Sequence, residues 1–323
     1  MFKIFIQTDK FQGGGPNSFR SRLISALNGM EDIKVVTEIG QKFDLELALI
    51  RKVYKHDKPY ILRLGSCYYD KKKIWNNKPI AKAVKRASYV IFQSKFAYKL
   101  CNQTLRIETR NLIKGNRYSI IYNGVDVDYI KSIEPNKKII PGSFIACGPW
   151  NPNKRPISTI KGFLESDIKR HLYIVGGEGL GGGPISKKYN SKYVHILGKL
   201  SNKEMISTMK ACDYQIHLCH IDICSNAVIE GLTCGLNVLC TNLGGTKELV
   251  GKNGVILEID KFWNTKYIKQ RILDKVDKVP PSTISKGIHR LMKKNRRSIN
   301  NDFDINKIAT KYYKIIKQVI KKK

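Results

Sequence analysis

Residues 219–235 read CHIDICSNAVIEGLTCG, an apolar run that holds an acid on either side of its central part. Ser225 and Asn226 favour the start of a helix, and the apolar residues after them favour continuing it inward. The pattern therefore predicts Asp222 on a loop and Glu230 on the first turns of a helix. The next run, LNVLCTN, is typical of a buried strand. A polar loop between buried elements in this order indicates a ligand site.

The same alternation of apolar runs and amphipathic stretches extends along the whole chain. It begins with FKIFIQ, a glycine-rich loop and SFRSRLISALNG, lapses into IEPNKKIIPGS at 133–143, and restarts with SFIACG. Strands that alternate with helices predict parallel sheets, and 323 residues suit two cores better than one. We therefore expect an α/β chain with two Rossmann-like parallel-sheet domains facing a cleft, over residues 1–140 and 141–302.

The last segment, FDINKIATKYYKIIKQVIKKK at 303–323, places apolar residues on one face of a helix and mostly lysines on the other. We expect this basic amphipathic helix to pack back on the N-terminal domain and to keep its lysines in solvent. Contact of the lysine face with anionic lipid is the alternative.

The chain carries a formal charge of +33, from 59 Lys and Arg against 26 Asp and Glu. So large an excess produces a positive field that attracts polyanions. Nucleic acid, an anionic membrane and a phosphorylated small substrate all fit, and composition alone does not rank them. A general richness in Lys, Ile and Asn is the alternative explanation for the excess.

The cysteines and the hydropathy bear on the compartment. None of the eight cysteines forms a CxxC pair and several lie in apolar runs, so we expect reduced core residues. The start, MFKIFIQTDK, is typical of a first strand and not of a signal peptide. No apolar run approaches the roughly 18 to 20 residues of a membrane-spanning helix. We expect a cytoplasmic protein, with peripheral attachment to a membrane surface left open.

Three consecutive glycines, Gly13, Gly14 and Gly15, separate the first expected strand from its helix. Glycine lets a ligand approach the backbone, and the helix start behind the loop attracts anions. A dinucleotide fingerprint would need a further glycine at Ser18 and an acid after the second strand, and both are missing. An NAD(P)-dependent oxidoreductase is therefore kept only as an alternative, together with a basic nucleic-acid-binding protein.

Two groups of residues could suggest a metal. Asp126 and Asp128 form a DxD, but they follow an Asn-Gly turn, and Asp128 stands where an N-cap would open the next helix. In a strand, His217 and Cys219 share one face while His220 does not, which disfavours zinc. We therefore expect no metal site and no cofactor.

Seven motifs spread over most of the chain carry a resemblance to a known family. They are GGGPNSF, QSKF, IYNGVD, WNPNKRP, LYIVGGEG, LGKLSNKEM, and the opening stretch followed by GLNVLCTNLGGTKEL. Together they resemble the retaining nucleotide-sugar glycosyltransferases of family four, whose two-domain fold is called GT-B. The resemblance implies an acceptor-side domain at the N-terminus and a nucleotide-sugar donor domain at the C-terminus.

The family pairs two acids in an E-x7-E arrangement, and this chain has Asp222 and Glu230 at that spacing, with Asp in place of the first Glu. The resemblance implies that Glu230 holds the ribose hydroxyls of the donor and that the first acid lies near the donor sugar. The family also uses an Arg followed five residues later by Lys. Pro149 occupies the first of these positions and Lys154 the second, with Arg155 beside it as a substitute.

Breaking a sugar–phosphate bond builds negative charge on the departing diphosphate and an oxocarbenium-like centre on the sugar. Cations and free N–H groups must meet that charge, so we assign Asp222, Lys154 and Arg155 to catalysis. The residues assigned to donor binding are Glu230, Ser225, Asn226, Ala227, Gly176, Gly13, Gly14, Gly15, Asn17 and Asn123.

The expected activity is a metal-independent, retaining transfer of a hexosyl-type sugar. The donor would be a nucleoside-diphosphate sugar, and the acceptor a glycan, a lipid-linked molecule or another glycoconjugate. On the acceptor side we expect Arg63, Tyr68 and Tyr69, for which a purely structural role is an equal alternative. The sequence leaves open the sugar, the base, the acceptor and the oligomeric state.

Overall fold

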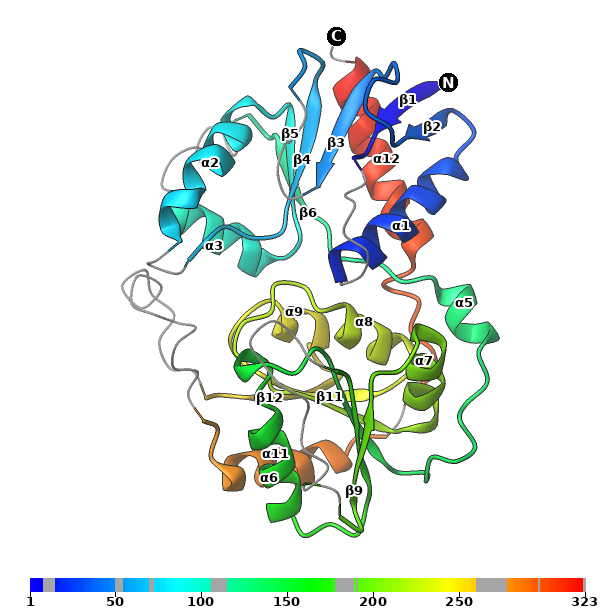
Figure 1. Cartoon of the computed structure of the whole chain (residues 1–323), viewed down its shortest axis with the longest axis vertical. Coiled ribbons are helices and arrows are strands. Elements are labelled where there is room, and N and C mark those ends of the chain that lie inside the picture. Colours follow the sequence, from blue (N-terminus) through cyan, green and yellow to red (C-terminus); the bar gives the residue numbers. More distant parts are fainter. Residues whose placement is uncertain are drawn as a thin grey trace. The chain divides into compact units, whose positions relative to one another are not determined.

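The computed structural model describes residues 1–7, 15–49, 55–69, 73–105, 115–177, 189, 191–259, 278–295 and 297–321. The described residues of Met1–Asp126 and Phe303–Lys323 form one compact unit, unit 1. Those of Val127–Tyr267 and Arg271–Asp302 form a second, unit 2 (Figure 1).

Unit 1 is built on a six-stranded parallel sheet. Its strands are β1 (Phe2–Phe5), β2 (Ile33–Val36), β3 (Leu45–Leu49), β4 (Tyr60–Leu64), β5 (Tyr89–Phe92) and β6 (Tyr118–Ile120). They lie in the order β2-β1-β3-β4-β5-β6. Strands β4 and β5 are buried along their whole length, because helices cover both faces of a parallel sheet.

Four helices and one short turn complete unit 1 in the described residues. They are α1 (Gly15–Asn28), η1 (Ile74–Asn76), α2 (Asn77–Arg86), α3 (Lys95–Leu105) and α12 (Ile305–Lys321). Figure 1 shows α1 and α12 on one side of the sheet and α2 and α3 on the other.

The last helix of the chain, α12, packs on the N-terminal sheet. Its apolar face brings Ile308 and Tyr312 into the same core as Phe19 and Leu23 of α1. At the first residue of the helix, the Ile305 N–H donates to the carbonyl oxygen of Val125 at 2.8 Å, which joins the segment after β6 to the start of α12. The C-terminal segment therefore belongs to unit 1. No described helix is both long and apolar enough to cross a membrane.

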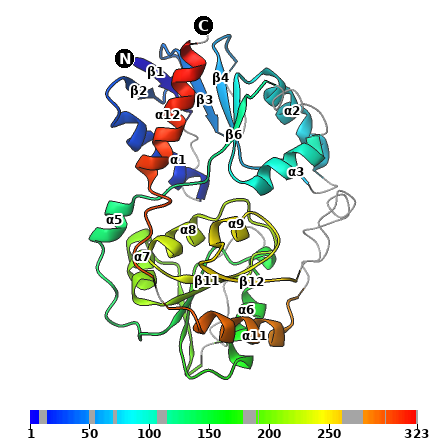
Figure 2. The same ribbon diagram turned by 180° about the vertical axis from the view of Figure 1, so that it is seen from behind.

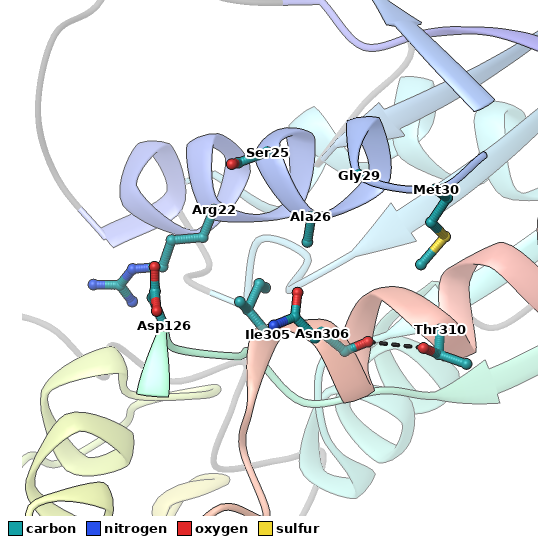
Figure 3. Close-up of a pocket in the computed structure, with 9 residues that line it drawn as sticks. All are labelled: Arg22, Ser25, Ala26, Gly29, Met30, Asp126, Ile305, Asn306 and Thr310. Carbon is teal, nitrogen blue, oxygen red and sulfur yellow. Dashed lines mark hydrogen bonds between the residues drawn. The ribbon is translucent and has the colours of Figure 1, made fainter. Parts of the chain in front are cut away.

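A pocket lies between α1 and α12 (Figure 3). Arg22 projects from α1 toward Asp126 at one end, and the Thr310 hydroxyl donates to the carbonyl oxygen of Asn306 at the other, at 2.8 Å. Asp126 therefore lines a pocket of unit 1, whereas Asp128 belongs to unit 2. The two acids of the DxD are thus assigned to different units.

Unit 2 is built on a second six-stranded parallel sheet. Its strands are β7 (Phe144–Cys147), β8 (Leu172–Val175), β9 (Val194–Gly198), β10 (Tyr214–His217), β11 (Asn237–Thr241) and β12 (Gly254–Leu257). They lie in the order β12-β11-β10-β7-β8-β9, so the direction of winding reverses between β7 and β10. Ligands of doubly wound sheets bind outside the carboxyl ends of the strands at such a reversal.

Helices cover both faces of the second sheet. Figure 2 shows α6 and α11 together on one side and α8 and α9 on the other. Gly162 of α6 allows close packing, because a Cβ atom there would stand 2.4 Å from Ile284 of α11. Among the described residues of unit 2, the helices are α5 (Val127–Ser132), α6 (Pro156–Glu165), α7 (Asn202–Ala211), α8 (Asn226–Thr233), α9 (Thr246–Val250) and α11 (Pro281–Met292), with the turn η2 (Pro152–Lys154).

The boundary between the units lies at Asp126 and Val127, not near residue 140 as the sequence pattern suggested. The reason is that α5 and the segment behind it are fastened to α7. Lys210 Nζ donates to the carbonyl oxygens of Ile130, at 3.1 Å, and of Ile133. A lysine can satisfy the last carbonyls of a short helix in this way. The Pro- and Lys-rich segment therefore runs along unit 2.

Candidate active site

The loops at the winding reversal of unit 2 bring together residues far apart in sequence. The first loop follows β7 and passes through η2 into α6, and it carries Lys154. The second follows β10 into α8, and it carries Asp222. Lys154 Nζ donates to Asp222 Oδ2 at 2.7 Å. A cation and an acid thus face each other at the edge of the sheet where a ligand is expected.

Both members of this pair keep their charge. Burial disfavours the ammonium of Lys154, but the neighbouring Asp222 outweighs it and raises the pKa of Lys154. Burial likewise opposes the carboxylate, yet the charge of Lys154 holds the pKa of Asp222 well below its usual range. The side chains remain 16% and 19% exposed, respectively. The ammonium of Lys154 therefore stays charged, and a ligand can still reach it.

His217 and Cys219 stand beside the pair as neutral groups. His217 Nε2 lies 3.4 Å from Asp222 Oδ2, without the alignment of a hydrogen bond. Burial and the charge of Lys154 lower the pKa of His217, and burial raises the pKa of Cys219 to about 12. At neutral pH these side chains are an uncharged imidazole and a thiol.

The donor atoms of His217, Cys219 and Asp222 lie within 4.8 Å of one another, a grouping that could hold a metal ion. However, the ammonium of Lys154 already stands 2.7 Å from the carboxylate of that group. A second cation there would be repelled at close range. The residues present fit a lysine ammonium better than a metal.

Asn153, which was not among the predicted site residues, fixes the loop that carries Asp222. Its carbonyl oxygen accepts the His220 N–H at 2.7 Å. Its side chain accepts the Ile221 N–H at 3.1 Å and donates to the Ile221 carbonyl oxygen at 3.0 Å. Asn153 directly precedes Lys154, so one short segment both supplies the cation and positions the loop of the acid.

The same loop is held from a second side by the end of β11. Thr241 Oγ1 donates to the carbonyl oxygen of Cys219, and the Gly245 N–H donates to that of Asp222, both at 2.7 Å. Gly244 has φ +92°, and a Cβ atom there would stand 2.6 Å from the Asp222 carbonyl oxygen. The GG pair after LCTNL was the sequence signal for this close approach.

Arg155 takes a positioning role instead of the direct catalytic role expected of it. Its backbone is left-handed, with φ +52°, and its side chain is buried. The guanidinium donates to the Leu218 carbonyl oxygen at 3.4 Å and lies 3.0 Å from Nδ1 of His220. It therefore supports the loop after β10 from inside the unit and does not stand beside Lys154 as a second open cation.

Helix α8 forms as the sequence predicted, with Asp222 on the loop before it and Glu230 in its second turn. Ser225 occupies the N-cap and makes no side-chain cap hydrogen bond, and the first turn of α8 begins with Asn226 and Ala227. Glu230 is 3% exposed. Burial, and next the charge of Glu230, raise the pKa of Cys147 to about 12, which places the carboxylate near the end of β7.

Gly176 lies at the same edge and is required by the backbone. It has φ +138°, and a Cβ atom there would stand 1.9 Å from the carbonyl oxygen of Gly148. The loops after β7 and β8 can therefore touch only if this residue is glycine. Its place among the donor residues stays a prediction.

The remaining donor residues were expected from the N-terminal half. Gly13 and Gly14 lie outside the described residues, whereas Gly15 begins α1. Asn17 Oδ1 accepts from Arg20 Nη2 at 2.8 Å within α1.

Arg63 is a core residue of unit 1, so its expected place on the acceptor side needs correction. It is 2% exposed, and its guanidinium lies 4.2 Å from the ring centroid of Phe19. Nε donates to the Tyr312 hydroxyl at 3.0 Å, and Nη2 donates to Asn123 Oδ1. Gln93, with its amide oxygen assigned toward the guanidinium, accepts from Nη1 at 2.7 Å. Asn123, expected to bind the donor, is thus engaged inside unit 1.

Tyr68 and Tyr69 follow β4 in unit 1. Tyr68 is 41% exposed and Tyr69 is half-buried. Their assignment to an acceptor stays a prediction.

Comparison with known proteins identifies a family model and relatives that are similar to this chain. Residues 144–267 match the family model described as "Glycosyl transferases group 1". An uncharacterized glycosyltransferase of Methanocaldococcus jannaschii, MJ1069, is 24% identical over 275 residues, which cover 80% of this chain and 66% of that relative. This chain thus spans slightly less than two thirds of the relative's length.

Two solved structures superpose on nearly the whole chain. Anabaena HepE, in complex with UDP and glucose, covers 98% of this chain and 100% of its own, at a TM-score of 0.59 and 16% identity. Sucrose-phosphate synthase from Thermosynechococcus elongatus covers 100% of both chains, at a TM-score of 0.67 and 13% identity. The chain has the GT-B fold.

In this GT-B chain, the part that matches the group 1 model contains Lys154, Asp222 and Glu230. The comparisons support a glycosyltransferase of that group and do not favour an oxidoreductase. The loop after β7 agrees, because GPWNPNKR has only one glycine and lacks a dinucleotide fingerprint.

Proposed function

We propose that this chain is a metal-independent, retaining glycosyltransferase. It transfers a hexosyl-type sugar from a nucleoside-diphosphate sugar to a glycan, a lipid-linked molecule or another glycoconjugate. The observation that carries the proposal is the Lys154–Asp222 pair at the winding reversal of unit 2, inside the region that matches the group 1 model.

The donor diphosphate meets positive charge from two sources. One is the ammonium of Lys154, which Asp222 keeps protonated. The other is the N-terminus of α8, the end at which the helix dipole favours negative charge. Both are in place before the reaction, so they stabilise the negative charge that grows on the leaving diphosphate.

We assign different roles to the two carboxylate oxygens of Asp222, one structural and one in substrate binding. Oδ2 is engaged by Lys154, and no described residue donates a hydrogen bond to Oδ1. Oδ1 is therefore the oxygen available to a hydroxyl of the donor sugar. This arrangement compensates for the missing methylene relative to Glu, because the acid acts first by orienting Lys154.

Glu230 holds the nucleoside. Its carboxylate is buried on α8 near the end of β7, and a ribose that reaches it offers two hydroxyl donors. Since HepE was solved with UDP, we take UDP-sugars as the first donors to test. No metal is assigned to the diphosphate, because Lys154 stands where the cation is needed.

The test is a thermal-shift screen of nucleoside-diphosphate sugars, because a ligand that binds only the folded state raises its melting temperature. At least one should stabilise the protein, and its transfer or hydrolysis should persist in EDTA. Anomeric retention is checked by NMR of the product. Activity that EDTA abolishes and Mn²⁺ restores would contradict metal independence alone.

The ribose assignment has its own test. Glu230→Ala should weaken binding of the free nucleoside diphosphate by roughly 10- to 100-fold in calorimetry, the usual cost of losing hydrogen bonds to a charged group. The matched control is Glu165→Ala, an exposed acid at the end of α6. Unchanged affinity in Glu230→Ala removes the ribose contact from the proposal.

A further inference from the structure

The outer face of α2 in unit 1 combines positive charge with an exposed indole. Trp75 lies in η1, the single turn that leads into α2, and is 67% exposed. The other described tryptophan, Trp150, is buried. An indole left this far in solvent lacks the burial that normally stabilises so large an aromatic side chain.

Lysines continue this surface along the helix. Lys78, Lys82 and Lys85 are exposed at a spacing that puts them on one face, while Ile80 and Val84 pack inward. No Asp or Glu occurs between residues 71 and 107. None of the described residues forms an ion pair with these three lysines. We call Trp75, Lys78, Lys82 and Lys85 the α2 patch.

The α2 patch is fixed to the edge of the sheet. Asn77 Nδ2 donates to the Tyr68 carbonyl oxygen at 2.7 Å, and the Tyr68 N–H donates to Asn77 Oδ1 at 2.8 Å. These two hydrogen bonds join the segment after β4 to the first turn of α2. The patch therefore begins at the carboxyl end of a parallel strand, the edge where such sheets bind ligands.

We propose that the α2 patch docks unit 1 on an anionic lipid surface. Indole rings concentrate at the boundary between lipid headgroups and hydrocarbon, and lysines beside them are drawn to anionic headgroups. Single-stranded nucleic acid binders instead present several aromatic rings to successive bases. One indole at the end of a lysine-lined helix face fits a membrane better. Lipid binding is independent of sugar transfer, so it can succeed or fail separately from the proposed activity.

Helix α12 of the same unit provides a matched control. Lys307, Lys311 and Lys314 are exposed and have the same spacing as the lysines of the α2 patch. No described residue of α12 is a large exposed apolar side chain, and Lys317 is paired with Asp32. Helix α12 therefore offers equal charge without the indole.

The first test measures binding of the full chain to vesicles of phosphatidylcholine and phosphatidylglycerol in equal parts, by co-sedimentation. The variant Lys78→Gln/Lys82→Gln/Lys85→Gln should bind more weakly by on the order of 10², at roughly fivefold per lysine. The control Lys307→Gln/Lys311→Gln/Lys314→Gln removes the same charge and should bind nearly as the wild type does. Equal losses in both variants would overturn the proposal, because vesicle binding would then depend on the net charge of the chain and not on the α2 patch.

The second test isolates the indole. Salt screens the lysines but not apolar insertion, so Trp75→Ser should lose the binding that survives high salt. Vesicles should also shift tryptophan emission to the blue in the wild type and not in Trp75→Phe. Absence of the shift in the wild type overturns the proposal. So does loss of binding to a labelled single strand in the α2 triple variant with vesicle binding unchanged, since the partner would then be nucleic acid.

Discussion

A long cation lies near the carboxyl end of a strand in each unit, Arg63 in unit 1 and Lys154 in unit 2, and the surroundings of these two cations differ. In unit 1, the guanidinium of Arg63 is almost fully enclosed, and its hydrogen bonds go to neutral groups such as Tyr312 and Asn123. In unit 2, the ammonium of Lys154 faces the carboxylate of Asp222, and both side chains keep some exposed surface.

The difference distinguishes a contact that serves only the fold from a site that can bind a ligand. A buried charge without a counter-ion is tolerated only when its donors are hydrogen-bonded, and each guanidinium nitrogen of Arg63 has an acceptor. That arrangement leaves nothing for a ligand. Asp222 keeps Lys154 protonated and uses only its Oδ2 to do so. The ammonium therefore stays charged, and Asp222 Oδ1 remains available as an acceptor. We therefore expect loss of Lys154 to affect turnover and loss of Arg63 to affect folding.

The largest expected effect is on turnover in Lys154→Ala. Removing one preorganised donor to the leaving group typically costs on the order of 10²–10³ in kcat. The control is Lys161→Ala, an exposed lysine of the following helix, which should leave kcat unchanged. Steady-state kinetics and melting temperature are measured for both. Near-normal turnover in Lys154→Ala would show that the ammonium of Lys154 does not stabilise the leaving group.

The next effect is on stability in Arg63→Met. Several buried acceptors lose their donor, at about 1–3 kcal/mol for each group left unsatisfied, so we expect a loss of about 3 kcal/mol in the free energy of unfolding. Urea denaturation measures it, with the exposed Arg86→Met as control. Nucleotide affinity of the folded variant should match the wild type. A variant with normal stability but weakened nucleotide affinity would show that Arg63 contributes to ligand binding and not to the fold.

A smaller effect is expected at Asn153, which positions the loop of Asp222. Asn153→Ala removes both side-chain contacts to Ile221 and should lower kcat by roughly tenfold, because small displacements of reacting groups are costly. Nucleotide affinity should change less than kcat, since Glu230 lies on α8. An equal fall in kcat and affinity, with a lowered melting temperature, would indicate a purely structural role.

The smallest effect is a pH dependence of stability. Burial, then Lys154, lower the pKa of His217, so folded His217 takes up a proton less readily than unfolded His217. Its contribution is therefore fully present above the ordinary value of about 6.5 and is lost as the pH falls below it, by at most about 1.4 kcal/mol per pH unit. His217→Gln should flatten the unfolding free energy between pH 6.5 and 5, whereas Arg63→Met should not. Identical profiles in His217→Gln and wild type would show that this imidazole is not held neutral.

The sequence correctly predicted the parallel α/β architecture, because strand and helix periodicity are set by neighbouring residues. It also placed Asp222 on a loop and Glu230 on a helix, since the turn and cap residues between them are local signals. It did not predict the boundary at residues 126 and 127. The Pro- and Lys-rich appearance of 133–143 suggested a linker, whereas Lys210 of a later helix fastens the preceding segment to unit 2.

Only the tertiary structure decided which charged residues face a ligand and which are enclosed. Lys154 and Asp222 are 68 residues apart, and Arg63 and Tyr312 are 249 apart. Arg155 looked like an open cation in sequence, yet its left-handed backbone and its contacts with Leu218 and His220 turn it inward. Residue type and spacing along the chain determine what a side chain can do. Its partners are set by strand order and loop packing, which arise only when distant segments meet.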